Sequence, residues 1–187
     1  MPWSIDTVHT HVGFSVKHMM VATVRGQFKS YRATLRLDPK DFARSKFEGE
    51  IDVASVDTGN VDRDNHLRTN DFFDVPNHPL ITFKSTRIEA KDAGEYTVHG
   101  DLTIRGVTQP VALDVEYFGT SKNPYGKTVA GLSVRGTINR KDFGVSFNKV
   151  LETGGVAVAE KVKLEIDVEA VAVEDAVASS PSPSATA

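Results

Sequence analysis

The 187-residue chain is predicted to be an all-β protein of eight antiparallel strands. The first observation is an alternation of apolar and polar residues that recurs along the chain and is typical of strands with one buried face. The second is that turn-forming sequences such as Asp92-Ala93-Gly94 separate the alternating segments. Because parallel strands need long crossovers, strands joined by such short connections are expected to pair antiparallel.

The first half of the chain contains four alternating segments. In the first, Val12, Phe14 and Val16 share one face, while Ser15 and Lys17 share the other. The predicted strands of this half cover residues 12–18, 24–37, 47–57 and 80–87.

The second half alternates more regularly. Near its end, Val162, Leu164 and Ile166 oppose Lys163 and Glu165, as expected for a strand with one apolar and one solvated face. The predicted strands of this half cover residues 96–105, 111–117, 130–138 and 162–168.

Two stretches interrupt the alternation. Between residues 58 and 79 the segment 62–68 can form a short helix, with Asn60 or Asp62 as its N-cap. The second stretch, residues 139–155, is interpreted as a long functional loop or a bulged corner. Residues 171–187 are rich in Ala, Ser and Pro and are predicted to form a disordered tail after a single domain of residues 1–170.

Composition excludes several classes of function. Charged residues make up 25% of the chain and the net charge is −3, so the sequence shows no general affinity for nucleic acid. The absence of cysteine excludes disulfides, thiolate metal sites and a cysteine nucleophile. No leader pattern and no run near the roughly 20 apolar residues of a membrane span is found, so a soluble cytoplasmic protein is expected.

Alternation alone does not decide between a two-sheet sandwich and a barrel, nor between a filled barrel and one that holds a ligand. The predicted inner faces mix bulky and small residues. The bulky ones are Phe14, Phe47, Phe83 and Tyr96, and the small ones are Ala33, Gly49, Gly100, Ala130 and Gly136. The small residues either leave room for a cavity or mark bends where strands coil.

Several short strings in a fixed order resemble the YceI-like lipid/polyisoprenoid-binding family, and together they span Trp3 to about Ala170. The most specific is Arg63-Asp64-Asn65-His66-Leu67 followed by Asp71-Phe72-Phe73-Asp74. The others cover residues 3–18, 26–28, 55–58, 79–85, 100–108 and 140–145. The resemblance implies an eight-stranded antiparallel lipocalin-like β-barrel with a short helix near residues 60–70. It also implies a polyisoprenoid, quinone-like or fatty-acyl lipid inside the barrel. Many relatives are exported.

On this basis the chain is expected to bind, sequester or transport a lipid without catalysis, and to need no cofactor and no metal. The residues predicted to line the apolar cavity are Phe14, Val16, Phe28, Leu35, Phe47, Ile51, Phe72, Phe73, Phe83, Val98, Leu102, Leu113, Leu132, Val134 and Phe143. The candidates for contact with the lipid head group are His9, His11, His18, Arg63 and Arg140. Trp3 is expected to plug the base of the barrel. Transient membrane contact and a homodimer are compatible with the sequence.

Other interpretations remain open at this point. His9 and His11 share a strand face and could hold a metal with His66, His78 or a carboxylate. Residues 63, 64 and 66 could serve as acid–base groups for an enzyme acting on a small hydrophobic substrate, although capping and pairing with neighbouring strands is the favoured role. A filled structural or stress-response barrel is the third possibility. Phe72 and Phe73 either line the cavity or fasten the helix to the barrel.

Overall fold

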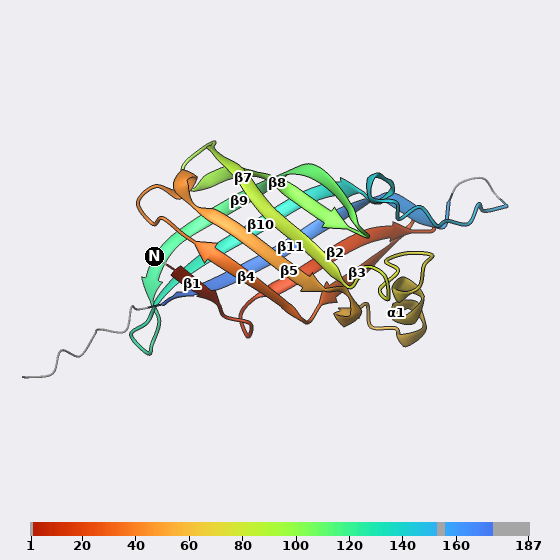
Figure 1. Ribbon diagram of the computed structural model, residues 1–187, viewed down its shortest axis with the longest axis horizontal. Helices are drawn as coiled ribbons and strands as arrows, with labels where there is room; N and C mark the ends of the chain where they lie inside the picture. The colour runs from red at the N-terminus through yellow and green to blue at the C-terminus, as the bar shows by residue number, and fades with distance from the viewer. Residues whose placement is uncertain (1, 153–155, 174–187) are drawn as a thin grey trace, which may run out of the picture.

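The computed structural model describes residues 2–152 and 156–173, and its strands form one antiparallel sheet that closes into a barrel (Figure 1). The strands are β1 (Pro2–Ile5), β2 (His11–His18), β3 (Ala22–Phe28), β4 (Tyr31–Arg36), β5 (Lys46–Asp52), β6 (Val56–Asp57), β7 (Leu80–Ala90), β8 (Glu95–Ile104), β9 (Val107–Lys122), β10 (Thr128–Asn139) and β11 (Val158–Ala172). The helices are α1 (Val61–Arg68) and the 3-10 turns η1 (Phe42–Arg44), η2 (Val53–Ser55) and η3 (Arg140–Phe143).

The barrel closes through β11, which pairs with β10 on one side and with both β1 and β2 on the other. β1 also pairs with β4, where Trp3 lies opposite Leu35. The pairs β1/β2, β3/β4 and β5/β6 are therefore single wall strands, each interrupted once. Counted in this way, they and β7 to β11 make eight strands, which confirms the predicted eight-stranded antiparallel barrel.

Two glycines on inward faces make room for aromatic rings of neighbouring strands. A Cβ atom on Gly26 would lie 2.4 Å from the Phe14 ring, and one on Gly100 would lie 2.4 Å from the Phe83 ring. Gly49, by contrast, faces open space, because its Cβ would meet nothing closer than the Arg32 carbonyl oxygen at 4.0 Å. Of the small residues expected on the inner faces, Gly49 therefore leaves room for a cavity, whereas Gly100 accommodates a bulky neighbour.

An aromatic group closes the end of the barrel near the N-terminus. Phe42 of η1 is 2% exposed and packs on Phe47, Tyr96 and Tyr117, with ring centroids 5.6, 4.4 and 4.7 Å away. Trp3 is buried in the same apolar cluster, which agrees with its predicted position as a plug.

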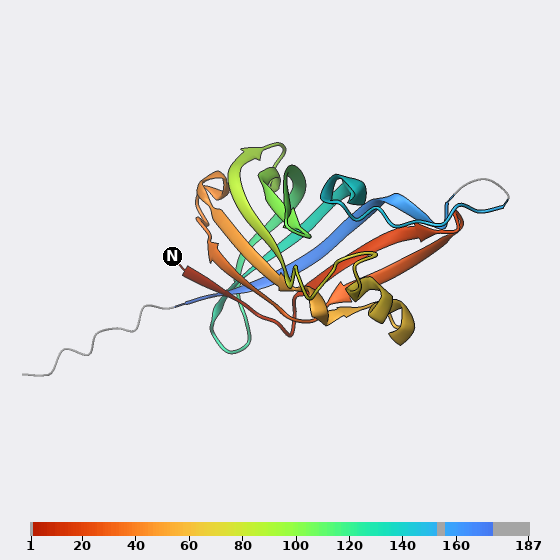
Figure 2. The ribbon, with the colours of Figure 1, turned by 45° about the vertical axis from the view of Figure 1, so that its right-hand side comes forward.

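Helix α1 lies at the other end of the barrel, beside β3 (Figures 1 and 2). Asn60 is its N-cap and accepts a hydrogen bond from the Arg63 backbone N–H at 2.9 Å. The buried carboxylate of Asp64 accepts from both the backbone N–H and the hydroxyl of Thr58, at 2.8 and 2.6 Å. The predicted helix and the Asn60 cap are confirmed, and these bonds tie α1 to the end of β6.

The second interruption is a corner held by one buried cation. After η3, Gly144 adopts a left-handed conformation with φ of 74° and turns the chain back towards the start of β11. The Arg140 guanidinium donates to the carbonyl oxygens of Val145, Phe147, Val158 and Ala159 over 2.7 to 3.2 Å. These bonds join both sides of the corner. In the residues that the structure describes, this stretch therefore agrees with the bulged-corner interpretation.

Strand β11 continues to Ala172, two residues past the expected end of the domain at residue 170. This extension occurs because β1 pairs with it through Trp3 and Ala172. Residues 174–187, and with them most of the predicted disordered tail, lie outside the described residues. Within the described part of the chain, the only α-helix is much too short to reach across a bilayer.

Candidate ligand-binding site

The barrel encloses a cavity of about 310 Å³ whose lining is almost entirely carbon. Its walls include residues of two apolar clusters. Leu35 and Val98 belong to the cluster around Trp3, and Phe28 and Ile81 belong to a second cluster, against which Leu67 of α1 packs. A volume of this size lies at the lower end of the range found for small-molecule sites, about 300–1,000 Å³. The cavity is the principal candidate for a functional site in the described structure.

All fifteen residues that the sequence predicted for an apolar lining lie in the wall of this cavity. For the twelve that lie in strands, alternation fixes which side chains face inward, whereas Phe72 and Phe73 lie after α1 and Phe143 lies in η3. Further residues on the inward faces of the strands also line the cavity, although they are not among the fifteen. These include Ile104, Val115, Ile138, Val162, Leu164, Ile166 and Val168.

The segment after β6 covers one end of the cavity. Leu67 of α1 lines the cavity together with Phe72 and Phe73. Phe72 also contacts the His66 and Phe147 rings, with centroids 5.0 and 5.3 Å away. The two phenylalanines therefore line the cavity and also fasten the helical segment to the barrel.

Apart from Arg140 in η3, the charged residues that line the cavity lie on one side of the wall. They are Arg32 of β4 and Glu48 and Glu50 of β5. These residues border the cavity next to the inward positions Ala33 and Gly49, which have little or no side chain. Arg32 forms an ion pair with Glu50, and Glu48 with Lys84 at 3.2 Å. Thr10 and Tyr31 also line this side, where the Tyr31 hydroxyl donates to the Thr10 carbonyl oxygen at 2.9 Å. Burial raises the pKa of this tyrosine above its ordinary value.

The five candidates for a head-group site are not brought together. Arg140 lines the cavity, but its guanidinium is occupied by the four carbonyl oxygens, and burial lowers its pKa below the usual value. The Arg63 side chain is bound to Thr58 outside the cavity. None of the three histidines at positions 9, 11 and 18 lines the cavity, and all three are exposed. His11 precedes the inward Val12, so it faces outward.

The acid–base interpretation required polar groups that converge inside the cavity. Arg63 and Asp64 are bound to Thr58, as favoured from the sequence, whereas His66 lies 2.8 Å from the Asp71 carboxylate. His9, Arg63 and His66 are exposed, and none of them lines the cavity. The enzyme hypothesis loses its main support in this arrangement.

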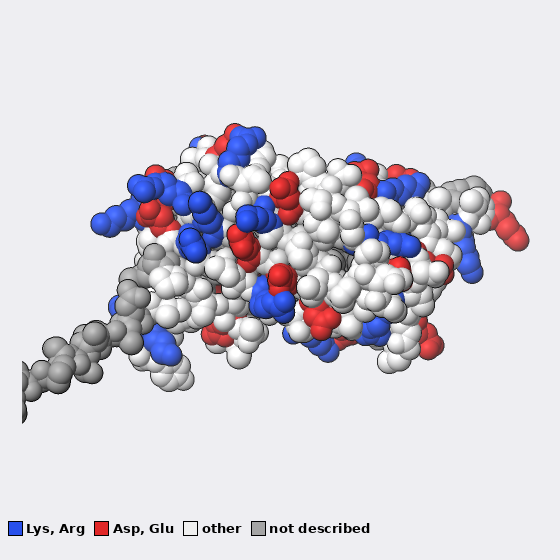
Figure 3. Space-filling view, viewed as in Figure 1, with Lys and Arg blue, Asp and Glu red and all other residues white. Residues whose placement is uncertain are grey.

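The outer surface has no single sign of charge on the face seen in Figure 3, where lysines and arginines alternate with acidic residues. Ion pairs on the outer surface include Arg135 with Asp167 of the neighbouring strand at 3.0 Å, and Lys91, in the turn after β7, with Asp114 of β9 at 2.6 Å. This face has the character of solvated strand surfaces and lacks the basic stripe of a nucleic-acid site.

Comparison with known proteins finds matches along nearly the whole barrel. A UPF0312 protein of Staphylococcus epidermidis is 44% identical over 168 residues, which are 89% of this chain and 95% of that protein. The crystal structure of a Campylobacter jejuni YCEI protein is 37% identical, with a TM-score of 0.74, and the match covers 90% of this chain and 96% of that one.

A more distant structure, described as a polyisoprenoid binding domain from Saccharophagus degradans, is 15% identical with a TM-score of 0.65. It covers 91% of this chain and 98% of that chain, so it shares the fold. The family model of the YceI-like domain matches residues 3–170. The match covers the whole barrel except Pro2 and the last two residues of β11, and the chain therefore belongs to the YceI-like family.

Proposed function

We propose that this protein binds a long amphiphilic lipid of the polyisoprenoid, quinone-like or fatty-acyl class and encloses its apolar tail in the barrel. The observation that carries the proposal is the cavity of about 310 Å³, lined by apolar side chains from every part of the wall. Fold and family membership support it, because the domain from Saccharophagus degradans with the same fold is described as polyisoprenoid binding.

Burial of the tail supplies the binding energy. Each methylene group moved from water into an apolar site contributes about 0.8 kcal/mol. A tail of ten buried carbons therefore gains roughly 8 kcal/mol before binding costs are subtracted. The walls that receive it are already formed, since inward residues such as Leu102 and Leu132 are held by strand pairing. A Kd of 1 μM corresponds to about 8.2 kcal/mol, so micromolar affinity requires a tail with more than ten buried carbons once the binding costs are subtracted.

The polar groups at the cavity have existing partners, which favours binding over catalysis. Arg140 donates to four carbonyl oxygens, and Arg32 and Glu48 form ion pairs. Sequestration or transport of a lipid requires none of these groups to change its protonation state. In this proposal the head group lies outside the apolar lining, towards the side of the wall formed by β4 and β5.

Titration of delipidated protein with a fluorescent acyl probe, cis-parinaric acid, tests this function. We expect saturable 1:1 binding with a Kd in the micromolar range or lower, since the cavity can bury much of the acyl chain. A dansyl-labelled prenyl alcohol in the same assay distinguishes prenyl from acyl ligands. If neither probe gave a saturable signal, the proposed function would be wrong.

A further inference from the structure

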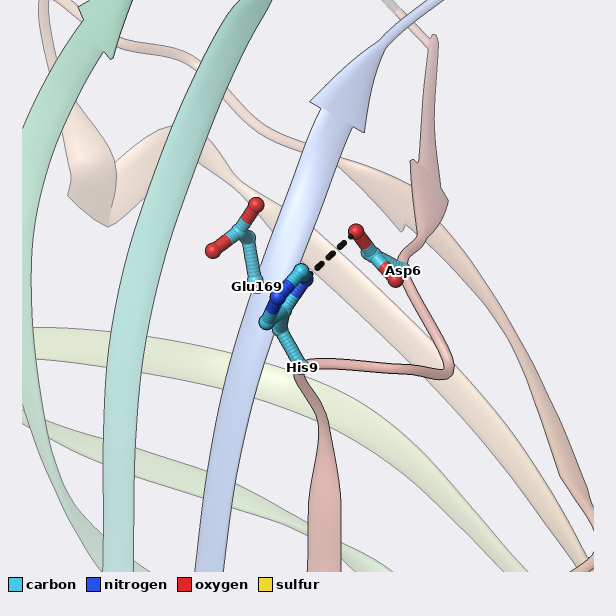
Figure 4. Close-up of side chains that lie close together, drawn as sticks. All are labelled: Asp6, His9 and Glu169. Carbon is cyan, nitrogen blue, oxygen red and sulfur yellow. Dashed lines mark hydrogen bonds and ion pairs between the residues drawn. The ribbon is translucent and has the colours of Figure 1, made fainter. Parts of the chain in front are cut away.

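The connection between β1 and β2 brings three potential metal ligands together on the outside of the barrel (Figure 4). Asp6 and His9 belong to this connection, and Glu169 belongs to β11, about 160 residues later in the chain. His9 Nδ1 lies 2.9 Å from Asp6 Oδ2. One ligand atom from each of the three residues lies within 4.8 Å of the other two.

The backbone holds this connection against β11 independently of the three side chains. The Asp6 N–H donates to the Glu169 carbonyl oxygen at 2.9 Å, and the Glu169 N–H donates to the Thr10 hydroxyl at 3.1 Å. The other carboxylate oxygen of Asp6 accepts from the Val8 N–H at 2.9 Å, which fixes its orientation. The residues are therefore positioned before any ligand binds, and such preorganisation favours binding.

The local charge favours a cation. With a neutral imidazole the three side chains carry two negative charges. The hydrogen bond and charge of Asp6, together with the charge of Glu169, raise the pKa of His9, while the same hydrogen bond lowers the pKa of Asp6. Figure 4 shows the His9 ring between the two carboxylates, so a cation near its nitrogen would be attracted from both sides.

We propose that Asp6, His9 and Glu169 form a binding site for one divalent transition-metal ion, with Zn²⁺ as the best match. Zinc accepts imidazole nitrogen and carboxylate oxygen at about 2.0–2.2 Å, and a water can take the fourth position of a site with three protein ligands. Mg²⁺ and Ca²⁺ prefer oxygen ligands alone. His9 Nδ1 and Asp6 Oδ2, now 2.9 Å apart in a hydrogen bond, would separate slightly to bind the ion, and a Glu169 carboxylate oxygen lies within 4.8 Å of both as the third ligand.

This site differs from the histidine pair suggested by the sequence and departs from the expectation of no metal. His11 is not part of it, and His66 and His78 lie near Asp71 and Asp74 instead. Bound metal would fasten the interrupted wall strand to β11. The flanking residues Ile5 and Thr10 line the cavity, so the site lies beside its wall. The proposal stands independently of lipid binding.

Calorimetric titration of metal-free protein with Zn²⁺ at pH 7.5 tests the site. We expect one ion per chain, with the affinity reduced at least tenfold in His9→Gln and in Glu169→Gln. His99→Gln is the matched control, because His99 also pairs with a carboxylate, Glu89 at 3.0 Å, but has no place in a three-ligand group of the described residues. This control should bind as the unaltered protein does.

Two further readouts separate metal binding from a structural role of His9. Co²⁺ should give visible d–d absorption bands in the unaltered protein and not in His9→Gln, and excess Mg²⁺ should not displace it. Affinity should decrease as pH is lowered, because the imidazole must be neutral to bind a metal. Absence of stoichiometric Zn²⁺ binding, or an equal loss of affinity in His99→Gln, would show that the three residues form only a hydrogen-bonded surface cluster.

Discussion

Replacing Gly49 by leucine is expected to weaken binding of the acyl probe at least tenfold while the barrel remains folded. Gly49 lines the cavity from β5, between Ala33 and Phe83 of the neighbouring strands. Its added Cβ would meet no atom closer than 4.0 Å, so the rest of the side chain can enter the empty interior without displacing the wall. A tenfold loss corresponds to about 1.4 kcal/mol, less than the contribution of two buried methylene groups.

The matched control for this variant is Thr34→Leu, which adds the same side chain to the exposed outer face of β4, paired with Glu48. Circular dichroism and thermal unfolding should show both variants folded. Gly49→Phe should lower the affinity further, because a larger side chain occupies more of the cavity. Unchanged affinity in both Gly49 variants, or an equal loss in Thr34→Leu, would place the ligand somewhere other than the cavity.

Replacing Arg140 by methionine is expected to lower the free energy of unfolding by at least about 3 kcal/mol, the scale of a lost buried polar network. Methionine keeps most of the aliphatic stem but leaves the carbonyl oxygens of Val145, Phe147, Val158 and Ala159 without their shared donor. Urea denaturation followed by intrinsic fluorescence measures the change through the transition midpoint.

The control for this second variant is Arg135→Met. Arg135 is half exposed and pairs with Asp167 on the surface, so its loss should cost no more than about 1 kcal/mol. If Arg140→Met were as stable as Arg135→Met, Arg140 would not be the group that holds the corner. Its guanidinium would then be free to serve a ligand, as first expected from the sequence.

The strands and the apolar lining could be predicted because both depend on a local pattern. Phe14 and Leu132 are predicted to face inward whatever the barrel closure, since each is the large apolar residue between a glycine and a serine along its strand. Helix α1 could also be predicted from local signals. Its N-cap, Asn60, and its apolar residue that lines the cavity, Leu67, both belong to the helical segment itself. The choice between a filled barrel and a container depended instead on family resemblance.

The polar residues could not be placed because their environment depends on how strands distant in sequence meet. Arg140 has the sequence context of a solvated loop residue, and only the return of the chain to β11 supplies its four acceptors. Asp6 and His9 are near each other in the sequence, but Glu169 reaches them only through the β1–β11 register. The sequence around Asp6 and His9 does not indicate that Glu169 lies beside them in the fold.

If the barrel encloses a lipid, the most direct test is to identify what the protein carries. Protein purified from its own host without detergent would be extracted with organic solvent and analysed by mass spectrometry, with Gly49→Phe processed in parallel. We predict about one prenyl, quinone or acyl lipid per unaltered chain and a strongly reduced amount in the variant. An extract without lipid, or equal lipid in both proteins, would contradict the assignment of the cavity as the binding site.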